Sequence, residues 1–199
     1  MEKTKRQSEV TRTTKETTVF VALNLDGTGA CQTIETGIPF LDHMLTLLAV
    51  HSLFDLTVRA AGDLEVDDHH TVEDIALTLG QALKECLGGK KGIIRYGEAT
   101  LPMDETLVRV ALDFSGRPFL HYQLELPYET IGGMAVENVR EFMQALVNTV
   151  GMNLHIDLLH GINTHHMVEA TFKAMARALK TAVAYEDRVD GVWSSKGVL

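Results

Sequence analysis

One short pattern occurs twice in this chain, and its repetition limits the folds that the chain can adopt. Residues 68–74 read DHHTVED and lead into the apolar-periodic segment IALTLGQAL, while residues 164–170 read THHMVEA and lead into TFKAMARAL. Both copies contain His-His-x-x-Glu at the expected first turns of a helix, and both helices reach an Ala-Leu pair at the same offset. A single short motif is a weak signal, but two copies in matching contexts indicate a common origin.

The rest of the sequence repeats in the same way. Residues 105–116 align without a gap with residues 16–27, and each half reads as about three strands, a helix, a strand and a His-His helix. We expect strands at residues 8–14, 17–25, 30–35, 52–60, 105–116, 119–124 and 154–158, and helices beginning at Pro39, at the first His-His pair (ending at Gly88-Gly89), over residues 134–150 and at the second His-His pair.

The sequence therefore predicts an α+β fold with an internal duplication, in which four helices pack between two four-stranded mixed sheets. The first half-repeat is expected at residues 1–90 and the second at residues 91–199, as one structural unit with a C-terminal tail at residues 187–199. Two independent domains are less favoured, because each half alone is small for a hydrophobic core.

Helix geometry predicts how the paired histidines act. Residues three and four apart share a helix face, so Glu73 lies beside His69 or His70. Adjacent residues are about 100° apart around the helix axis, so the two neighbouring histidines cannot easily bind one ion. The same holds for His165 and His166 in the second copy. The economical arrangement has two ions, each bound by one imidazole from each pair and by one of the two glutamates.

The ligand types limit the identity of the ions. Imidazole and carboxylate together suit Mn²⁺, Fe²⁺ or Zn²⁺, and no cysteine lies nearby to complete a closed structural zinc site. The alternative is that each motif is only a solvated helix face or an i,i+4 pair, which is the commoner explanation of a single copy. Two copies at equivalent positions favour a paired metal centre.

Composition excludes several classes of protein. The net charge of −9 and the absence of a basic patch disfavour a nucleic-acid or anionic-membrane partner. No apolar run approaches the roughly 20 residues that a membrane span needs, and the polar N-terminal segment has no apolar core of a secretory signal. Cys31 and Cys86 are too few for a disulfide framework and indicate a reducing, cytoplasmic location.

Several other residues have side chains suited to metal or phosphate binding. His43 lies on a helix with an apolar opposite face, and Glu141 lies at the related position of the second half. Arg95 and Arg117 both lie close to glycines at expected strand ends, and a guanidinium group is suited to binding phosphate. Residues 194–197 (SSKG) offer hydroxyls, a cation and backbone N–H groups. Each alone is more often a plain surface or core residue.

Seven stretches of the chain together resemble one enzyme family. They are residues 14–17 (TKET), 25–29 (LDGTG), 37–45 (GIPFLDHML), 67–74 (DDHHTVED), 115–118 (SGRP), 165–174 (HHMVEATFKA) and 194–197 (SSKG). In this order, over nearly the whole length, they resemble imidazoleglycerol-phosphate dehydratase of histidine biosynthesis. The resemblance implies a hydro-lyase that converts imidazole glycerol phosphate to imidazole acetol phosphate and water, with two Mn²⁺ per active site and a metal-bound imidazolate intermediate.

The resemblance also implies a role for individual residues. The first ion is expected to bind His43, His70, Glu73 and His165, and the second His69, His166, Glu169 and Glu141, a position where many family members have histidine. Glu16 is the expected proton shuttle, and the catalytic set is Glu16, His43, His70, Glu73, His165 and Glu169. Substrate contacts are expected from Glu16, His51, Arg95, Arg117, Lys173, Ser194, Ser195 and Lys196.

The same family implies a large homo-oligomer of twenty-four subunits with octahedral symmetry, in which neighbouring subunits share active sites. One alternative is a non-catalytic metal-binding protein with a paired His/Glu centre, which would leave Arg117, Lys173 and the Ser-Ser-Lys tail without a role. A dimetal hydrolase is less favoured, because the zinc-protease order His-Glu-x-x-His is absent.

Overall fold

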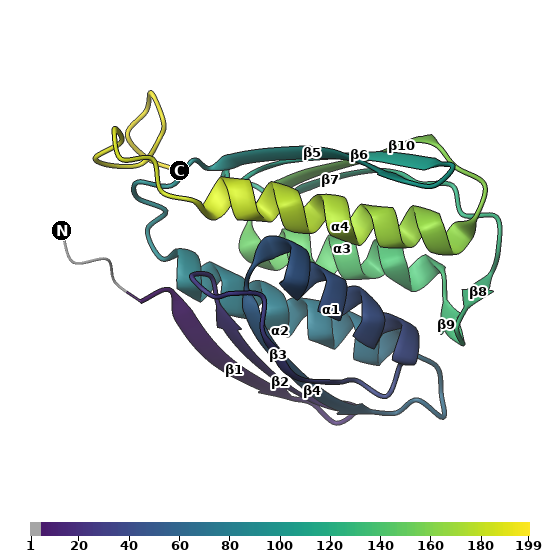
Figure 1. Ribbon diagram of the computed structural model, residues 1–199. Coiled ribbons are helices and arrows are strands. Elements are labelled where there is room, and N and C mark those ends of the chain that lie inside the picture. Colours follow the sequence, from purple (N-terminus) through teal and green to yellow (C-terminus); the bar gives the residue numbers. More distant parts are fainter. Residues whose placement is uncertain (1–4) are drawn as a thin grey trace.

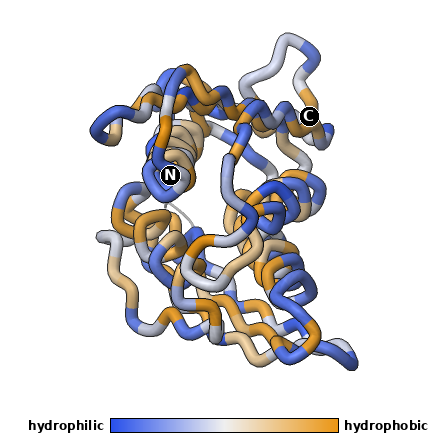
Figure 2. The backbone as a smooth tube through the Cα atoms, turned by 90° about the vertical axis from the view of Figure 1, so that its right-hand side faces the viewer, coloured by the Kyte–Doolittle hydropathy of each residue, from blue (hydrophilic) through white to orange (hydrophobic). Residues whose placement is uncertain are grey.

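Two four-stranded sheets enclose a layer of four helices in the computed structural model, which describes residues 5–199 (Figure 1). This arrangement confirms the α+β class with four helices between two mixed sheets. Figure 2, which looks along the helices, shows the helices between the two sheets. The predicted boundary between half-repeats after residue 90 stays a prediction, and residues 1–4 of the first half-repeat lie outside the described residues.

The two sheets have the same strand order. The first has the order β1 (Gln7–Thr13), β2 (Thr17–Asn24), β4 (Asp55–Gly62) and β3 (Cys31–Glu35), and the second β5 (Tyr96–Met103), β6 (Thr106–Asp113), β10 (Asn153–His160) and β7 (Phe119–Gln123). In each sheet the last two strands are parallel and the other neighbours antiparallel. Equivalent strands therefore occupy equivalent places in the two sheets.

The helices pair across the two halves of the chain. They are α1 (Pro39–Ser52), α2 (His69–Leu87), α3 (Glu137–Val150) and α4 (Thr164–Val183). α1 packs on α4 and α2 packs on α3, while α2 also covers β1 and β2, and α4 covers β5 and β6. Each helix of the first half thus packs against a helix of the second half.

Buried and partly exposed residues alternate along the central strands, and this alternation explains why the helices cover one face of each sheet. Val19, Val21 and Leu23 of β2 are buried and point toward the helices, while the residues between them are partly exposed. β6 has the same pattern at Val108, Val110 and Leu112. Burying each such side chain stabilises the fold by about 1.5–3 kcal/mol relative to exposure, so the helix faces and sheet faces form one continuous core.

Some predicted boundaries were wrong. The strand expected at residues 52–60 begins only at Asp55, because α1 continues to Ser52 and Leu53 ends it with a left-handed backbone (φ 63°). The helix expected from residue 134 begins at Glu137, because the segment before it forms β9 (Met134–Ala135), which pairs with β8 (Thr130–Ile131). Gly88 ends α2 as expected, and its N–H contacts the carbonyls of Lys84 and Glu85.

The helices described in residues 5–199 lack the length and apolar character needed to cross a bilayer.

Gly97 of β5 lies against the backbone of α4 and has no room for a side chain. A methyl group there would lie 1.9 Å from the carbonyl oxygen of Ala178. We expect Gly97→Ala to lower the free energy of unfolding by about 3 kcal/mol, since β5 and α4 would have to separate. The matched control is Gly89→Ala, where the nearest atom would be 3.9 Å away in the flexible Lys91 side chain. Urea unfolding of both variants measures the difference, and equal stabilities would contradict the close approach.

Candidate metal centre and phosphate-binding pocket

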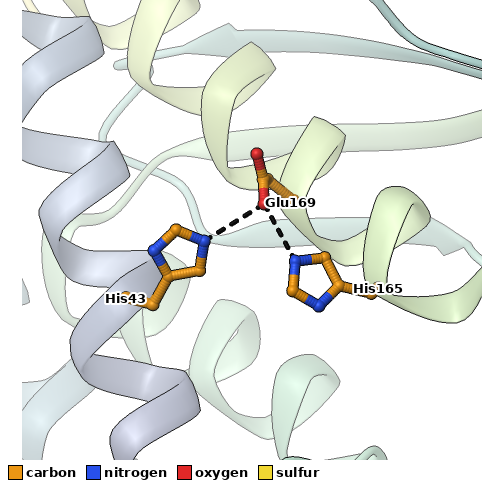
Figure 3. A group of neighbouring side chains, drawn as sticks. All are labelled: His43, His165 and Glu169. Carbon is orange, nitrogen blue, oxygen red and sulfur yellow. Dashed lines mark hydrogen bonds and ion pairs between the residues drawn. The ribbon is translucent and has the colours of Figure 1, made fainter.

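Three potential metal ligands meet where α1 and α4 begin (Figure 3). The Nε2 atoms of His43 and His165 lie 3.1 Å and 3.0 Å from the same oxygen, Oε2 of Glu169. His43 comes from the second turn of α1, and the other two come from the first turns of α4. Two imidazoles and a carboxylate converging on one point are a suitable donor set for Mn²⁺, Fe²⁺ or Zn²⁺.

Glu169 is a buried carboxylate held ionised by its neighbours. Burial raises its pKa, but hydrogen bonds from Lys173, His43 and His165 outweigh burial and lower the pKa to about 2. The Lys173 ammonium lies 2.6 Å from Oε1, one helical turn further along α4. The carboxylate therefore has one oxygen toward the histidines and the other toward Lys173, so it is charged at neutral pH.

Local sequence features place the two histidines at the start of α4. The side chain of Asn163 is the N-cap and accepts from the backbone N–H groups of His165 and His166. The Phe40 ring packs edge-on against the His165 imidazole, with 5.4 Å between ring centroids. The two adjacent imidazoles point apart, with rings at 89° and centroids 6.3 Å apart, as helix geometry predicted.

The other helix pair, α2 and α3, presents its own group of polar residues. His69 Nδ1 lies 3.1 Å from Oδ1 of Asn138, a buried residue in the first turn of α3. His70 Nδ1 lies 3.0 Å from Asp63 Oδ2 and 3.9 Å from Glu16 Oε2. The hydrogen bond that His70 donates to Asp63 is the main cause of a raised His70 pKa. The rings of His69 and His70 stand at 79° to each other.

The second histidine of α4 has a comparable partner. His166 Nδ1 lies 2.8 Å from Oε2 of Glu105, which raises the pKa of His166. Glu105 also accepts from the backbone N–H of Asn163, and this bond, followed by that of His166, holds the Glu105 pKa far below its usual range. Glu105 was not among the site residues expected from the sequence.

Not all of the predicted ligands meet within one chain. In residues 5–199, His43, His165 and Glu169 are the only group of three His, Cys, Asp or Glu side chains close enough to share an ion. Glu73 has no hydrogen bond or ion pair among these residues, and Glu141 pairs only with Arg140 at 3.2 Å. The sequence assigned Glu169 to a different ion from His43 and His165, whereas the structure groups the three. The assignment of ligands to two ions stays a prediction.

The predicted phosphate-binding residues gather around a second feature. A cavity of about 390 Å³ is lined by Arg95, Tyr96, Arg117, Trp193, Ser194, Ser195, Lys196, Val198 and Leu199. Arg117 and Lys196 are exposed there, and their side-chain cations have no partner among residues 5–199. Arg95 is buried and already engaged, because its guanidinium binds both oxygens of Asp113 (2.6 and 2.8 Å) and the Trp193 carbonyl (2.8 Å).

The cavity and the His-Glu cluster lie at opposite ends of the helix layer. All four helices begin at the end where the histidines cluster, and the C-terminal segment lies beyond the other end (Figure 1). α4 alone has 20 residues, which corresponds to about 30 Å. Lys173 lies between the two ends, and it also lowers the pKa of His51 on α1, though burial lowers it more.

Sequence reasoning missed Asp63, Asn138 and Asp113, each of which binds a predicted site residue. Asp63 and Asn138 belong to none of the paired motifs, and nothing in their local sequence distinguishes them from ordinary turn or helix-start residues. The only available signal was that a ligating imidazole needs an acceptor at its other nitrogen.

The chain is similar to known proteins over nearly its whole length. A family model described as imidazoleglycerol-phosphate dehydratase matches residues 36–179. Imidazoleglycerol-phosphate dehydratase of Syntrophomonas wolfei subsp. wolfei is 61% identical over 194 residues, covering 98% of each chain. The protein of the same name from Microcystis aeruginosa is 58% identical, covering 98% of this chain and 93% of its own.

Two solved structures have a similar fold. The imidazoleglycerol-phosphate dehydratase of Staphylococcus aureus subsp. aureus N315 has a TM-score of 0.82 at 42% identity, covering 90% of this chain and 99% of that chain. The Pyrococcus furiosus enzyme, in complex with (S)-C348, has a TM-score of 0.82 at 37% identity, covering 96% of this chain and 100% of that chain.

The lowered pKa of Glu169 makes a prediction about acid stability. Its folded pKa of about 2 lies below its ordinary value of 4.5. The stabilisation from this carboxylate is therefore complete above pH 4.5 and is lost as the pH falls toward 2. In metal-free protein, we expect Glu169→Gln to remove this part of the pH dependence of the free energy of unfolding, measured by urea titration at several pH values. Glu98→Gln, on an exposed position of β5, is the control, and indistinguishable acid profiles for the two variants would contradict the expectation.

Proposed function

The chain belongs to the imidazoleglycerol-phosphate dehydratase family and is a hydro-lyase of histidine biosynthesis, and we propose that it acts at a paired metal centre shared between copies of the chain. The resemblance drawn from the sequence is confirmed by this membership. The reaction removes water from imidazole glycerol phosphate and leaves imidazole acetol phosphate. Family membership decides against a non-catalytic metal-binding protein.

The donor set supports a divalent metal ion. His43 and His165 each place an imidazole nitrogen within 3.1 Å of the same carboxylate oxygen of Glu169. No cysteine takes part in this group. We propose two Mn²⁺ per active site, held by His43, His69, His70, Glu73, Glu141, His165, His166 and Glu169. A bound divalent ion supplies Lewis acidity, which stabilises negative charge that develops on the substrate's imidazole ring.

The residues of the chain would position the substrate around this centre. Arg117, Ser194, Ser195 and Lys196 line the cavity near the C-terminus, where unpaired cations and hydroxyls suit a phosphate group. Arg95 lines the same cavity and holds the Trp193 carbonyl. His51 on α1 and Lys173 on α4 lie between this cavity and the histidine cluster. Phosphate binding would hold the reacting carbon at a fixed distance from the proton-transfer group.

Glu16 is the proposed proton-transfer group. It directly precedes β2, its side chain is 55% exposed, and its Oε2 lies 3.9 Å from His70 Nδ1. Elimination needs a group that removes a proton from carbon and a proton donor for the departing hydroxyl, and an exposed carboxylate beside the proposed metal ligands is suited to this transfer.

The separation of the two groups of residues supports an active site shared between chains. The histidines begin the helices, whereas the phosphate-binding cavity lies beyond the end of α4, about 30 Å away. A substrate as small as imidazole glycerol phosphate cannot reach both within one subunit. We propose that a neighbouring copy supplies the cavity, in a homo-oligomer of twenty-four subunits with octahedral symmetry. The two cysteines, neither in a disulfide, are in keeping with a cytoplasmic location.

Two impaired variants test whether chains share the site. We expect His165→Ala to disrupt metal binding and Arg117→Ala to lower kcat/KM about 10–100-fold through the lost charged hydrogen bonds. Co-expressed with different affinity tags and purified through both tags, the mixed particles should regain activity well above either variant alone. Mixed particles no more active than the separate variants would show that each chain carries a complete site.

Substitution of Glu16 tests the proton-transfer role. Metal-stripped wild-type protein should not consume imidazole glycerol phosphate until Mn²⁺ is added. Glu16→Gln should bind Mn²⁺ with unchanged affinity and yet lower kcat by roughly 100-fold, the usual size of a general acid–base contribution. Steady-state turnover and Mn²⁺ titration of both proteins give the comparison. Full turnover of the metal-loaded variant would exclude Glu16 as the shuttle, and a wild-type protein that binds metal without consuming substrate would refute the proposed site.

A further inference from the structure

Three of the proposed metal-binding histidines share a feature that no motif predicts. In each, the Nδ1 atom is already bound by an oxygen of another residue. The pairs are His69 with Asn138 Oδ1 at 3.1 Å, His70 with Asp63 Oδ2 at 3.0 Å and His166 with Glu105 Oε2 at 2.8 Å. The three acceptors come from a helix start, a loop and a strand turn, so the arrangement does not follow from one local structure.

These contacts determine which ring nitrogen remains available. An ionised carboxylate only accepts hydrogen bonds, so the Nδ1 atoms of His70 and His166 must carry the hydrogen. In the neutral imidazole the lone pair then belongs to Nε2, the nitrogen on the far side of the ring. The amide oxygen of Asn138 is also an acceptor, so the Nδ1 atom of His69 carries the hydrogen as well. His43 and His165 also direct Nε2 toward their common partner, Glu169.

We propose that Glu105, Asp63 and Asn138 are positioning residues of the metal centre, which hold three imidazoles with Nε2 directed at the ions. The proposal rests on the proposed function, because it takes these histidines as metal ligands. An acceptor at the outer nitrogen fixes the ring orientation and raises the basicity of the ligating nitrogen, and loss of such an acceptor typically weakens metal binding about 10–100-fold.

Glu105 has the most firmly held carboxylate of the three. Its Oε1 accepts from the backbone N–H of Asn163 at 2.8 Å and of Ile162 at 3.3 Å, and from Thr106 Oγ1 at 3.0 Å. Its Oε2 is therefore fixed in front of His166. Because Asn163 is also the N-cap of α4, one carboxylate fixes the histidine ring, the loop before α4 and the turn between β5 and β6 together.

The internal duplication gives an independent argument. Glu105 occupies the position equivalent to Glu16, yet the two carboxylates have different surroundings. Glu16 lies 3.9 Å from His70 and is 55% exposed, whereas Glu105 lies 2.8 Å from His166 and is 32% exposed. In the first half Asp63 accepts the hydrogen bond from His70, and Glu16 stays at the longer distance of 3.9 Å.

The residue equivalent to Asp63 in the second half explains the difference. Gly62 and Gly161 are equivalent, because an added Cβ would meet Thr17 and Thr71 at the first and Thr106 and Met167 at the second. Asp63 therefore corresponds to Ile162, an apolar residue that is 78% exposed. With no carboxylate at that position, Glu105 binds the histidine instead. One copy of the glutamate is free for catalysis, and the other has a fixed positioning role.

Mn²⁺ affinity of the full-length protein tests this assignment. Metal-free wild type, Glu105→Ala, Glu105→Gln and the control Glu98→Ala would be titrated with Mn²⁺ while the electron paramagnetic resonance signal of free Mn²⁺ is followed. We expect a Kd raised about 10–100-fold for Glu105→Ala, a smaller change for Glu105→Gln, whose amide oxygen still accepts, and no change for the control. Urea unfolding of the metal-free proteins separates loss of ligand positioning from loss of folding.

Each outcome decides a different point. A wild type that binds no Mn²⁺ would refute the proposed function itself. A wild type that binds Mn²⁺, together with a Glu105→Ala variant of equal affinity, would overturn the positioning role alone. If Glu105→Ala does not fold, Asp63→Ala gives the same test at His70, and unchanged affinity there would overturn the proposal.

A compensating substitution tests the equivalence of the two halves. Ile162→Asp introduces into the second half the carboxylate that the first half has at Asp63. In the Glu105→Ala background we expect it to recover at least part of the lost Mn²⁺ affinity. A double variant that binds Mn²⁺ no better than Glu105→Ala would contradict the proposed exchange of roles between Glu105 and Asp63.

Discussion

The packing of α1 on α4 and of α2 on α3 is the constraint on which the rest of the structure depends. Each pair joins a helix of the first half to one of the second, and both helices of a pair begin at the same end of the molecule. The apolar faces that drive this packing are continuous with both sheets. Because the helices start together, His43 of α1 reaches Glu169 of α4, 126 positions away in sequence.

The same parallel packing separates the chemistry within a chain. The candidate metal ligands His43, His165 and Glu169 gather where α1 and α4 begin, and the cations that suit phosphate gather beyond the end of α4. Rigid helices keep these two groups apart by about 30 Å, and this separation is the reason for proposing that one chain's cavity meets another chain's histidines. Lys173 forms an ion pair with Glu169 at 2.6 Å and also lies between the histidines and the cavity.

The two halves of the chain contain equivalent parts, and the surroundings of these parts differ. Glu16 and Glu105 directly precede the equivalent strands β2 and β6, but Asp63 stands near the first and Ile162 near the second. The first glutamate is exposed and lies 3.9 Å from His70, while the second is held by two backbone N–H groups, a hydroxyl and an imidazole. The proposed difference in role therefore coincides with a difference in one neighbouring residue.

By itself the sequence determined the fold class, the four helices and the divergence of adjacent histidines, because hydrophobic periodicity and helix geometry act over a few residues. It also identified the family, since the motifs extend over nearly the whole chain. The tertiary structure alone decided that Glu169 joins His43 and His165, that Arg95 is bound to Asp113, and that Asn138, Asp63 and Glu105 hold the histidine rings. These contacts depend on which side chains meet when separate elements pack. Hydrogen bonds tolerate only small changes in distance and angle, so local sequence patterns do not encode them.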